Sequence, residues 1–171
     1  MRASIRTNAN REQGHMMNRV RAFLDGLADT KRARAHAFDD KELAAAALLL
    51  EVAATDGHLD GSEAAAIRRA LARTFGLADA ELDALIAAAR TRADGSVQLF
   101  GFTRCFKDNS SYDERVALIE LLWEVALADG RIDHYESNLL RRIGGLLYVS
   151  DRDRGEARKR VERRQRSATA R

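Results

Sequence analysis

Apolar residues recur at helical spacing along most of the chain, and the breaks between these stretches fall at glycine and acidic residues. One stretch opens on a capping box, Asp39 with Glu42 three residues later, and residues 44–50 are apolar on every side. Such a sequence predicts a buried, central helix with a well-defined start. A second capping box, Ser111 with Glu114, predicts the start of another long helix, which should end at Gly130 because glycine adopts positive φ without strain.

The remaining pattern predicts further helices. Asp60 and Asp133 are expected caps of the helices after the two breaks, and helices are expected at residues 17–28, 79–90, 96–106 and 150–166. Residues 96–106 should supply most of the aromatic core. The chain of 171 residues has 46% hydrophobic residues and no proline, so we expect an all-α single compact bundle of about seven to eight helices.

The breaks themselves repeat. The first acidic turn (residues 56–63) and the second acidic turn (residues 129–136) both read D-G-x-(L/I)-D-x-x-E and lie 73 residues apart. Leu49 and Glu51 match Leu122 and Glu124 upstream, and the downstream residues also match: Ile67, Arg68 and Arg69 with Leu140, Arg141 and Arg142. The repetition predicts an internal pseudo-twofold helix-turn-helix repeat that brings the acidic turns together.

The two turns together would pool six carboxylates. Because close carboxylates repel one another, a cation would stabilise them, and oxygen ligands favour calcium, magnesium or manganese. One turn alone is not a calcium loop, because its first two ligand positions would hold apolar residues such as Val52 and Ala54. The candidate metal ligands are Asp56, Asp60, Glu63, Asp129, Asp133 and Glu136.

A second interpretation of these residues needs no metal. Asp60 with Glu63, and Asp133 with Glu136, are also what helix caps require, and an aspartate before glycine can accept hydrogen bonds from backbone amides across a turn. Capping alone and cation binding both remain open.

Charge divides the chain into parts. Residues 36–150 contain 12 basic and 19 acidic residues, whereas the flanks contain 17 and 7, so the centre is acidic and the ends are basic. We expect an N-terminal tail with a short amphipathic helix (1–38), a helical domain (39–166, with repeat one at 39–90 and repeat two at 111–166) and a short tail (167–171). The basic final helix offers an alternative function, binding of nucleic acid or an anionic surface; its candidates are Arg158, Lys159, Arg160, Arg163 and Arg164.

The doubled phrase A-x-x-D-G-x-(I/L)-D-x-x-E resembles the tellurite resistance TerB-like domains, over about residues 39–160. The resemblance implies an all-α domain of about seven helices with internal pseudo-twofold symmetry. It also implies that the six acidic residues form a metal-binding cluster, and it connects the chain with stress-response complexes near membranes.

We therefore expect a non-enzymatic binding or scaffold module with a protein partner. No nucleophile motif, phosphate-binding glycine loop or histidine pair accompanies the acids, so a metal-dependent hydrolase is disfavoured. Cys105, the only cysteine, should be a small core residue. No apolar run is long enough to span a bilayer and the first residues lack a signal core, so we expect a cytoplasmic protein that reaches membranes only through a partner or its basic tail.

Overall fold

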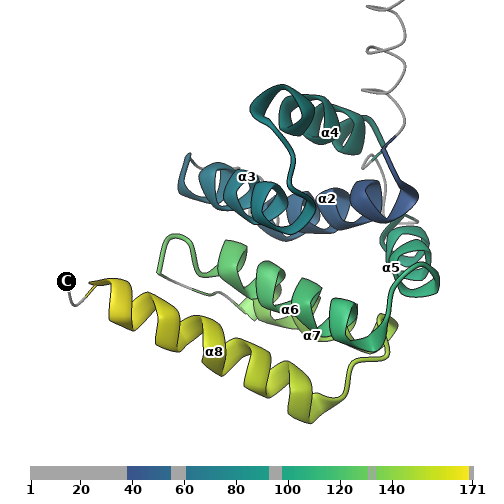
Figure 1. Cartoon of the computed structure of the whole chain (residues 1–171). Helices are drawn as coiled ribbons and strands as arrows, with labels where there is room; N and C mark the ends of the chain where they lie inside the picture. The colour runs from purple at the N-terminus through teal and green to yellow at the C-terminus, as the bar shows by residue number, and fades with distance from the viewer. Residues whose placement is uncertain (1–37, 55–60, 93–97, 131, 133, 170–171) are drawn as a thin grey trace, which may run out of the picture. The chain divides into compact units, whose positions relative to one another are not determined.

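Seven helices make up the part of the chain that the computed structural model describes, which is residues 38–54, 61–92, 98–130, 132 and 134–169. No strand occurs within those residues, so the predicted all-α class is confirmed. They belong to one unit that begins at Phe38 (Figure 1). The helices are α2 (Asp40–Ala53), α3 (Gly61–Phe75), α4 (Asp79–Arg92), α5 (Gln98–Asp108), α6 (Tyr112–Ala126), α7 (His134–Leu146) and α8 (Asp151–Thr169).

Helix α2 lies at the centre, as its apolar sequence predicts. Every residue from Leu43 to Leu50 is buried, together with Val52 and Ala53. Because these side chains point in all directions around the helix, α2 packs against α3, α4, α5 and α6. A buried Leu or Val side chain contributes about 1.5–3 kcal/mol relative to exposure, so the fully buried Leu48, Leu49 and Val52 of α2 stabilise the core substantially.

Both predicted capping boxes form. The Asp39 carboxylate accepts a hydrogen bond from the Lys41 N–H at 3.3 Å, and the Asp39 N–H donates to Glu42 at 3.2 Å. The Ser111 hydroxyl accepts from the Glu114 N–H at 3.3 Å, and the Ser111 N–H donates to the Glu114 carboxylate at 2.7 Å. These bonds satisfy N–H groups that a helix start leaves without partners, so they fix where α2 and α6 begin.

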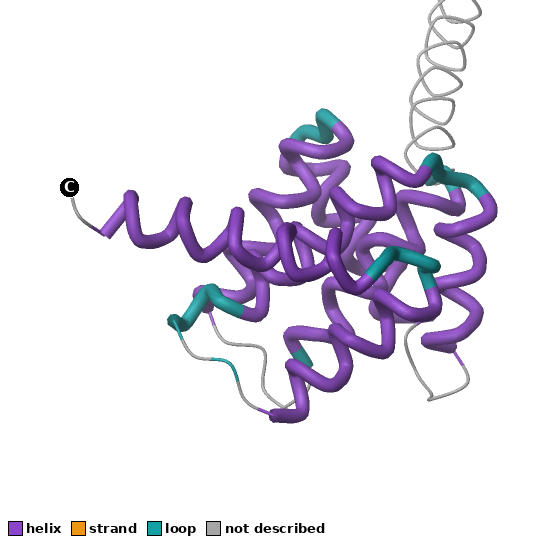
Figure 2. Tube along the Cα trace, turned by 90° about the horizontal axis from the view of Figure 1, so that it is seen from below, coloured by secondary structure: helices purple, strands orange, loops and turns teal. Residues whose placement is uncertain are grey.

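Helices α2 and α6 run in the same direction, and α3 and α7 run back (Figure 1). The chain leaves α2 and α6 at the same end of the bundle, and the view from below agrees (Figure 2). Helix α8 lies along α6, as α4 lies along α2. The arrangement is compatible with the internal repeat, which stays a prediction.

Helix α5 differs from expectation. Leu99 and Phe106 are buried, but Phe100 is 60% exposed, so the aromatic residues of this segment fill the core only in part. Leu99, Phe100 and Phe102 lie on different faces of a helix with 3.6 residues per turn, so they cannot all face the core. Phe100 therefore projects to the surface.

The two glycines of α7 also differ from each other. A Cβ on Gly144 would overlap with Cδ of Arg154, whereas a Cβ on Gly145 would meet nothing within 4 Å. A side chain of α8 therefore approaches α7 closely at Gly144 and not at Gly145.

The predicted N-terminal helix, residues 17–28, lies outside the described residues. Among the helices that are described, none is long and apolar enough to cross a membrane.

Candidate functional site

The helices that precede the two acidic turns end with the same backbone geometry. Ala54 caps α2 with φ −89° and ψ 8°, and Leu127 caps α6 with φ −93° and ψ 6°. The Ala54 N–H donates to the carbonyl of Leu50 at 2.9 Å, and the Leu127 N–H donates to that of Trp123 at 3.0 Å. Leu50 and Ala54 each lie 73 positions before their counterparts Trp123 and Leu127. The chain therefore leaves α2 and α6 in the same way.

Gly130 lies four residues after Ala126, where α6 ends, so this helix is shorter than predicted. Gly130 belongs to the turn that follows. Its φ is 81°, a left-handed value that residues with a Cβ rarely adopt, and its N–H donates to the Leu127 carbonyl at 3.0 Å. The equivalent Gly57 lies outside the described residues.

Three of the six predicted metal ligands are described. Glu63 lies in the first turn of α3 and is only 9% exposed, Glu136 lies in the first turn of α7 and is half-buried, and Asp129 is exposed after α6. Asp56, Asp60 and Asp133 lie outside the described residues. Helices α3 and α7 start at the same end of the bundle (Figure 1), and their first turns contain Glu63 and Glu136.

The carboxylates of Glu63, Asp129 and Glu136 are the kind of ligand that a hard cation prefers. Carboxylate oxygens are the preferred ligands of calcium, magnesium and manganese, and a buried carboxylate such as Glu63 is stabilised by nearby positive charge or donors. Within the described residues no group of three or more His, Cys, Asp or Glu side chains has the spacing of a metal site. Three of the six predicted ligands, Asp56, Asp60 and Asp133, lie outside those residues. Cation binding and capping therefore both stay predictions.

The basic residues of α8 are largely engaged within the protein. Arg160 and Arg164 contact the two carboxylate oxygens of Glu120 on α6 at 2.6 Å and 3.0 Å. Within α8, Arg158 pairs with Glu162 at 2.7 Å and Lys159 with Glu156 at 3.1 Å. Four of the five side chains predicted for nucleic-acid binding therefore have carboxylate partners, which leaves less free positive charge than the sequence suggests.

The start of α8 is also attached to α6. The Ser150 hydroxyl accepts a hydrogen bond from the Asp153 N–H at 3.1 Å and so caps the first turn of α8. Tyr112 donates to the Asp153 carboxylate at 2.5 Å and accepts from the Ser150 N–H at 3.1 Å. Hydrogen bonds from Ser150 and then Tyr112 lower the pKa of Asp153 below its usual range. Helix α8 is thus fixed at its start and along its length.

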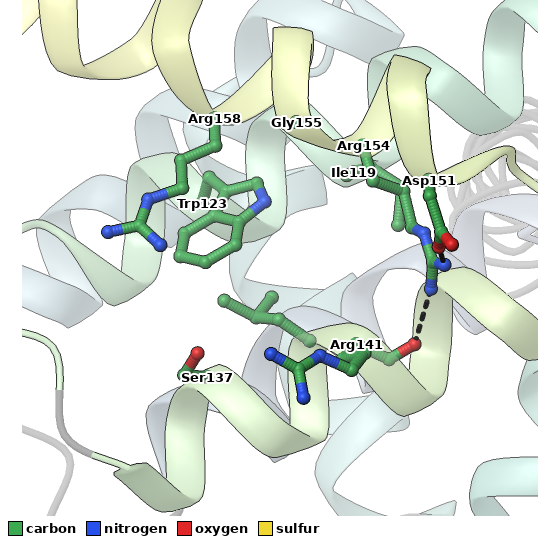
Figure 3. A pocket seen from close by; sticks show the side chains of 9 residues that line it. Ile119, Trp123, Ser137, Arg141, Asp151, Arg154, Gly155 and Arg158 are labelled. Carbon is green, nitrogen blue, oxygen red and sulfur yellow. Dashed lines mark hydrogen bonds and ion pairs between the residues drawn. The ribbon is translucent and has the colours of Figure 1, made fainter.

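Sequence analysis missed a pocket between α6, α7 and α8. Its volume is about 230 Å³, and its floor is formed by the buried side chains of Ile119, Trp123 and Leu140. Arginines surround this floor: Arg141 comes from α7, and Arg154 and Arg158 come from α8 (Figure 3). An apolar floor with a charged rim is typical of ligand sites.

Cys105 is half-buried, and its thiol lies 3.5 Å from the carbonyl oxygen of Asp40. Burial, and then the nearby Asp40 and Asp39 carboxylates, raise the pKa of this thiol. A raised pKa keeps the thiol protonated near neutral pH, which fits the predicted structural role rather than that of a nucleophile.

Comparison with known families gives one result. The family model described as "Tellurite resistance protein TerB" matches residues 42–159, which is most of the chain and spans α2 to α8. No curated protein and no solved structure matches the chain.

Proposed function

The chain belongs to the tellurite resistance protein TerB family, and from that premise we propose that it is a non-enzymatic binding module whose two acidic turns hold a divalent cation. The module would present its helical surface to a protein partner. We place that role in a stress response, because the family is described by tellurite resistance.

One observation supports the cation most strongly. Glu63 is nine-tenths buried in the first turn of α3, at the end of the bundle where α7 also starts with Glu136. Removing a carboxylate from water costs several kcal/mol unless charge or hydrogen bonds compensate. A cation shared between the turns would add positive charge to the interactions that Glu63 already makes.

The same side chains have a structural role in the proposal. The first turn of a helix leaves N–H groups exposed and has a partial positive charge, which favours Glu63 and Glu136 where they lie. A cation placed between two such turns would add to this preference. We expect the bound ion to join α3 to α7 and so to stiffen that end of the bundle.

The absence of enzymatic activity is part of the proposal. Its support is chemical: the sequence around the carboxylates has no nucleophile motif or histidine pair, and the raised pKa of Cys105 disfavours the reactive thiolate. A cytoplasmic location is proposed on the sequence alone.

Titration calorimetry with calcium, magnesium and manganese tests the cation. We expect saturable binding of at least one ion by the wild type, and loss of that binding in the Glu63→Gln/Glu136→Gln double variant. Glu81→Gln is a matched control, because Glu81 accepts from the Ala78 N–H at 2.9 Å at the start of α4, away from both turns. Binding that survives the double variant, or no binding by the wild type, refutes the cation site.

A further inference from the structure

The α6–α8 pocket has a counterpart in the first half of the chain. A second pocket of about 250 Å³ lies between α2, α3 and α4. Four positions of the first two helices correspond at an offset of 73: Leu50 with Trp123, Ala64 with Ser137, Ile67 with Leu140 and Arg68 with Arg141.

The third helix of each half contributes in the same spacing but at a different offset. The α2–α4 pocket takes residues 83, 86, 87 and 90 from α4, and the α6–α8 pocket takes 151, 154, 155 and 158 from α8. The offset here is 68, and it pairs Asp83 with Asp151 and Arg90 with Arg158. The two pockets are therefore built on one plan, with differences at single positions.

In the α2–α4 pocket, the arginine has carboxylate partners from its own chain. Arg68 donates to Asp83 through one nitrogen and lies 3.4 Å from Asp79 through another. Arginine and carboxylate geometries match well, so this framework holds a carboxylate against the arginine of its second helix.

In the α6–α8 pocket, the equivalent carboxylate, that of Asp151, does not pair with the arginine of the second helix. Asp151 pairs with Arg154, which occupies the position of Ile86, and Arg154 also donates to the Arg141 carbonyl at 2.8 Å. The Arg141 side chain is exposed and has no acidic partner among the described residues. Figure 3 shows its guanidinium beneath the pocket, on the side opposite α8.

The rest of the pocket limits what can bind beside Arg141. Arg158 lies over the Trp123 ring at 4.9 Å and pairs with Glu162. Arg154 pairs with Asp151, and Glu162 is shared between Arg158 and Arg166, which lies 3.7 Å from it. Arg141 is therefore the lining arginine without a carboxylate partner among the described residues, and a single such guanidinium suits a single carboxylate. The floor of Ile119, Trp123 and Leu140 suits an apolar group next to that carboxylate.

We propose that the α6–α8 pocket binds a carboxylate flanked by large apolar side chains, supplied by an acidic segment of a protein partner. The inference rests on the proposed function, whose partner it locates. The chain's own N-terminal segment is a poor occupant, because residues 1–37 contain 8 basic and 3 acidic residues.

Trp123 is the only tryptophan, so its fluorescence reports on this pocket directly. The probe is a blocked five-residue peptide, Ser-Leu-Glu-Phe-Ser, with the Gln version of the same peptide as its neutral control. We expect a saturable fluorescence change with the Glu peptide and at least about tenfold weaker binding of the Gln peptide, because a neutral amide cannot form the charge-assisted hydrogen bond with Arg141.

Variants separate the two pockets. Arg141→Ala should weaken binding of the Glu peptide about tenfold, and Arg68→Ala, its counterpart, should leave it unchanged. Arg154→Ile copies the first half of the chain and frees Asp151 to pair with Arg141, so it should also weaken binding.

Equal response to both peptides, or full affinity in Arg141→Ala, overturns the proposal. So does a response to inorganic phosphate or a short DNA duplex without one to the Glu peptide, which would assign the pocket to phosphate groups. Calorimetric cation binding should be the same in Arg141→Ala and wild type, so failure of the peptide site is distinguishable from failure of the cation site.

Discussion

Lys41 and Glu114 lie 73 positions apart, and their side chains meet, with Nζ 2.9 Å from Oε1. This separation is the offset between the two acidic turns. The contact joins the starts of α2 and α6, at the end of these helices opposite the turns. Contact between equivalent positions of two copies is what a twofold relation between the copies would produce, because only residues near the axis can meet their own equivalents.

The hydrogen-bond partners of Glu114 predict an acid-dependent stability. The hydrogen bond from the Ser111 N–H, followed by that from Lys41, lowers the pKa of Glu114 from 4.5 to about 2. A carboxylate whose pKa is lower in the folded state stabilises the fold above its unfolded pKa and loses that effect as the pH falls.

We therefore expect the difference in unfolding free energy between wild type and Glu114→Gln to shrink as the pH falls from about 5 to 2. Urea denaturation at stepped pH measures it. Asp113→Asn, which removes a neighbouring exposed carboxylate of the same helical turn, should keep the acid dependence of the wild type. A difference independent of pH would contradict the assignment.

Glu120 should hold α8 against α6. Its side chain is 19% exposed and accepts from both Arg160 and Arg164. We expect Glu120→Gln to cost about 1–2 kcal/mol of stability, between the values for exposed ion pairs and for buried charged hydrogen bonds. Glu156→Gln, which breaks only a pair within α8, should change stability by less than about 0.5 kcal/mol in the same denaturation experiment. Equal effects of the two changes would show that Glu120 has no such role.

The second acidic turn depends on Gly130. Its φ of 81° means that Gly130→Ala should destabilise the protein by about 1–2 kcal/mol, the cost of a left-handed conformation for a residue with a Cβ. Gly61→Ala is the control, since a Cβ there meets nothing within 4 Å and no positive φ is required. Thermal unfolding of both variants measures the difference, and an unaffected Gly130→Ala would mean that the turn adopts another conformation.

Gly144 and Gly145 should respond differently to substitution by alanine. Gly145→Ala should raise stability by up to about 1 kcal/mol through helix propensity alone. Gly144→Ala should not gain this stability, because its Cβ would displace Arg154 from the Arg141 carbonyl. Thermal unfolding compares the two, and the same gain in both would show that Arg154 moves aside at no cost.

The fold was predictable because its signals are local. Capping boxes at Asp39 and Ser111, and the glycine after α6, act within one helical turn, so sequence spacing alone reveals them. The exposure of Phe100 was not predictable in the same way, because burial depends on which face of α5 meets the core, and several faces carry apolar residues.

The candidate sites were predictable only in part. The repeated acidic turns are visible in the sequence, and the match of Arg68 with Arg141 is visible at the same offset of 73. The pocket was missed because its third helix follows a different offset. Helix α7 is shorter than α3, and α8 contributes residues five positions before those that an offset of 73 predicts. The pairing of Asp151 with Arg154 depends on which side chains lie close together in the folded protein, and residue spacing in the sequence does not reveal that.

The shared cation is tested most directly by paramagnetic broadening with manganese. When about one equivalent of Mn²⁺ is added to the isotopically labelled protein, amide signals at the start of α3, including Glu63, and those of Asp129 and Glu136 should broaden together at the same manganese concentration. Broadening at only one of the two turns, or at neither, would contradict a cation held between them.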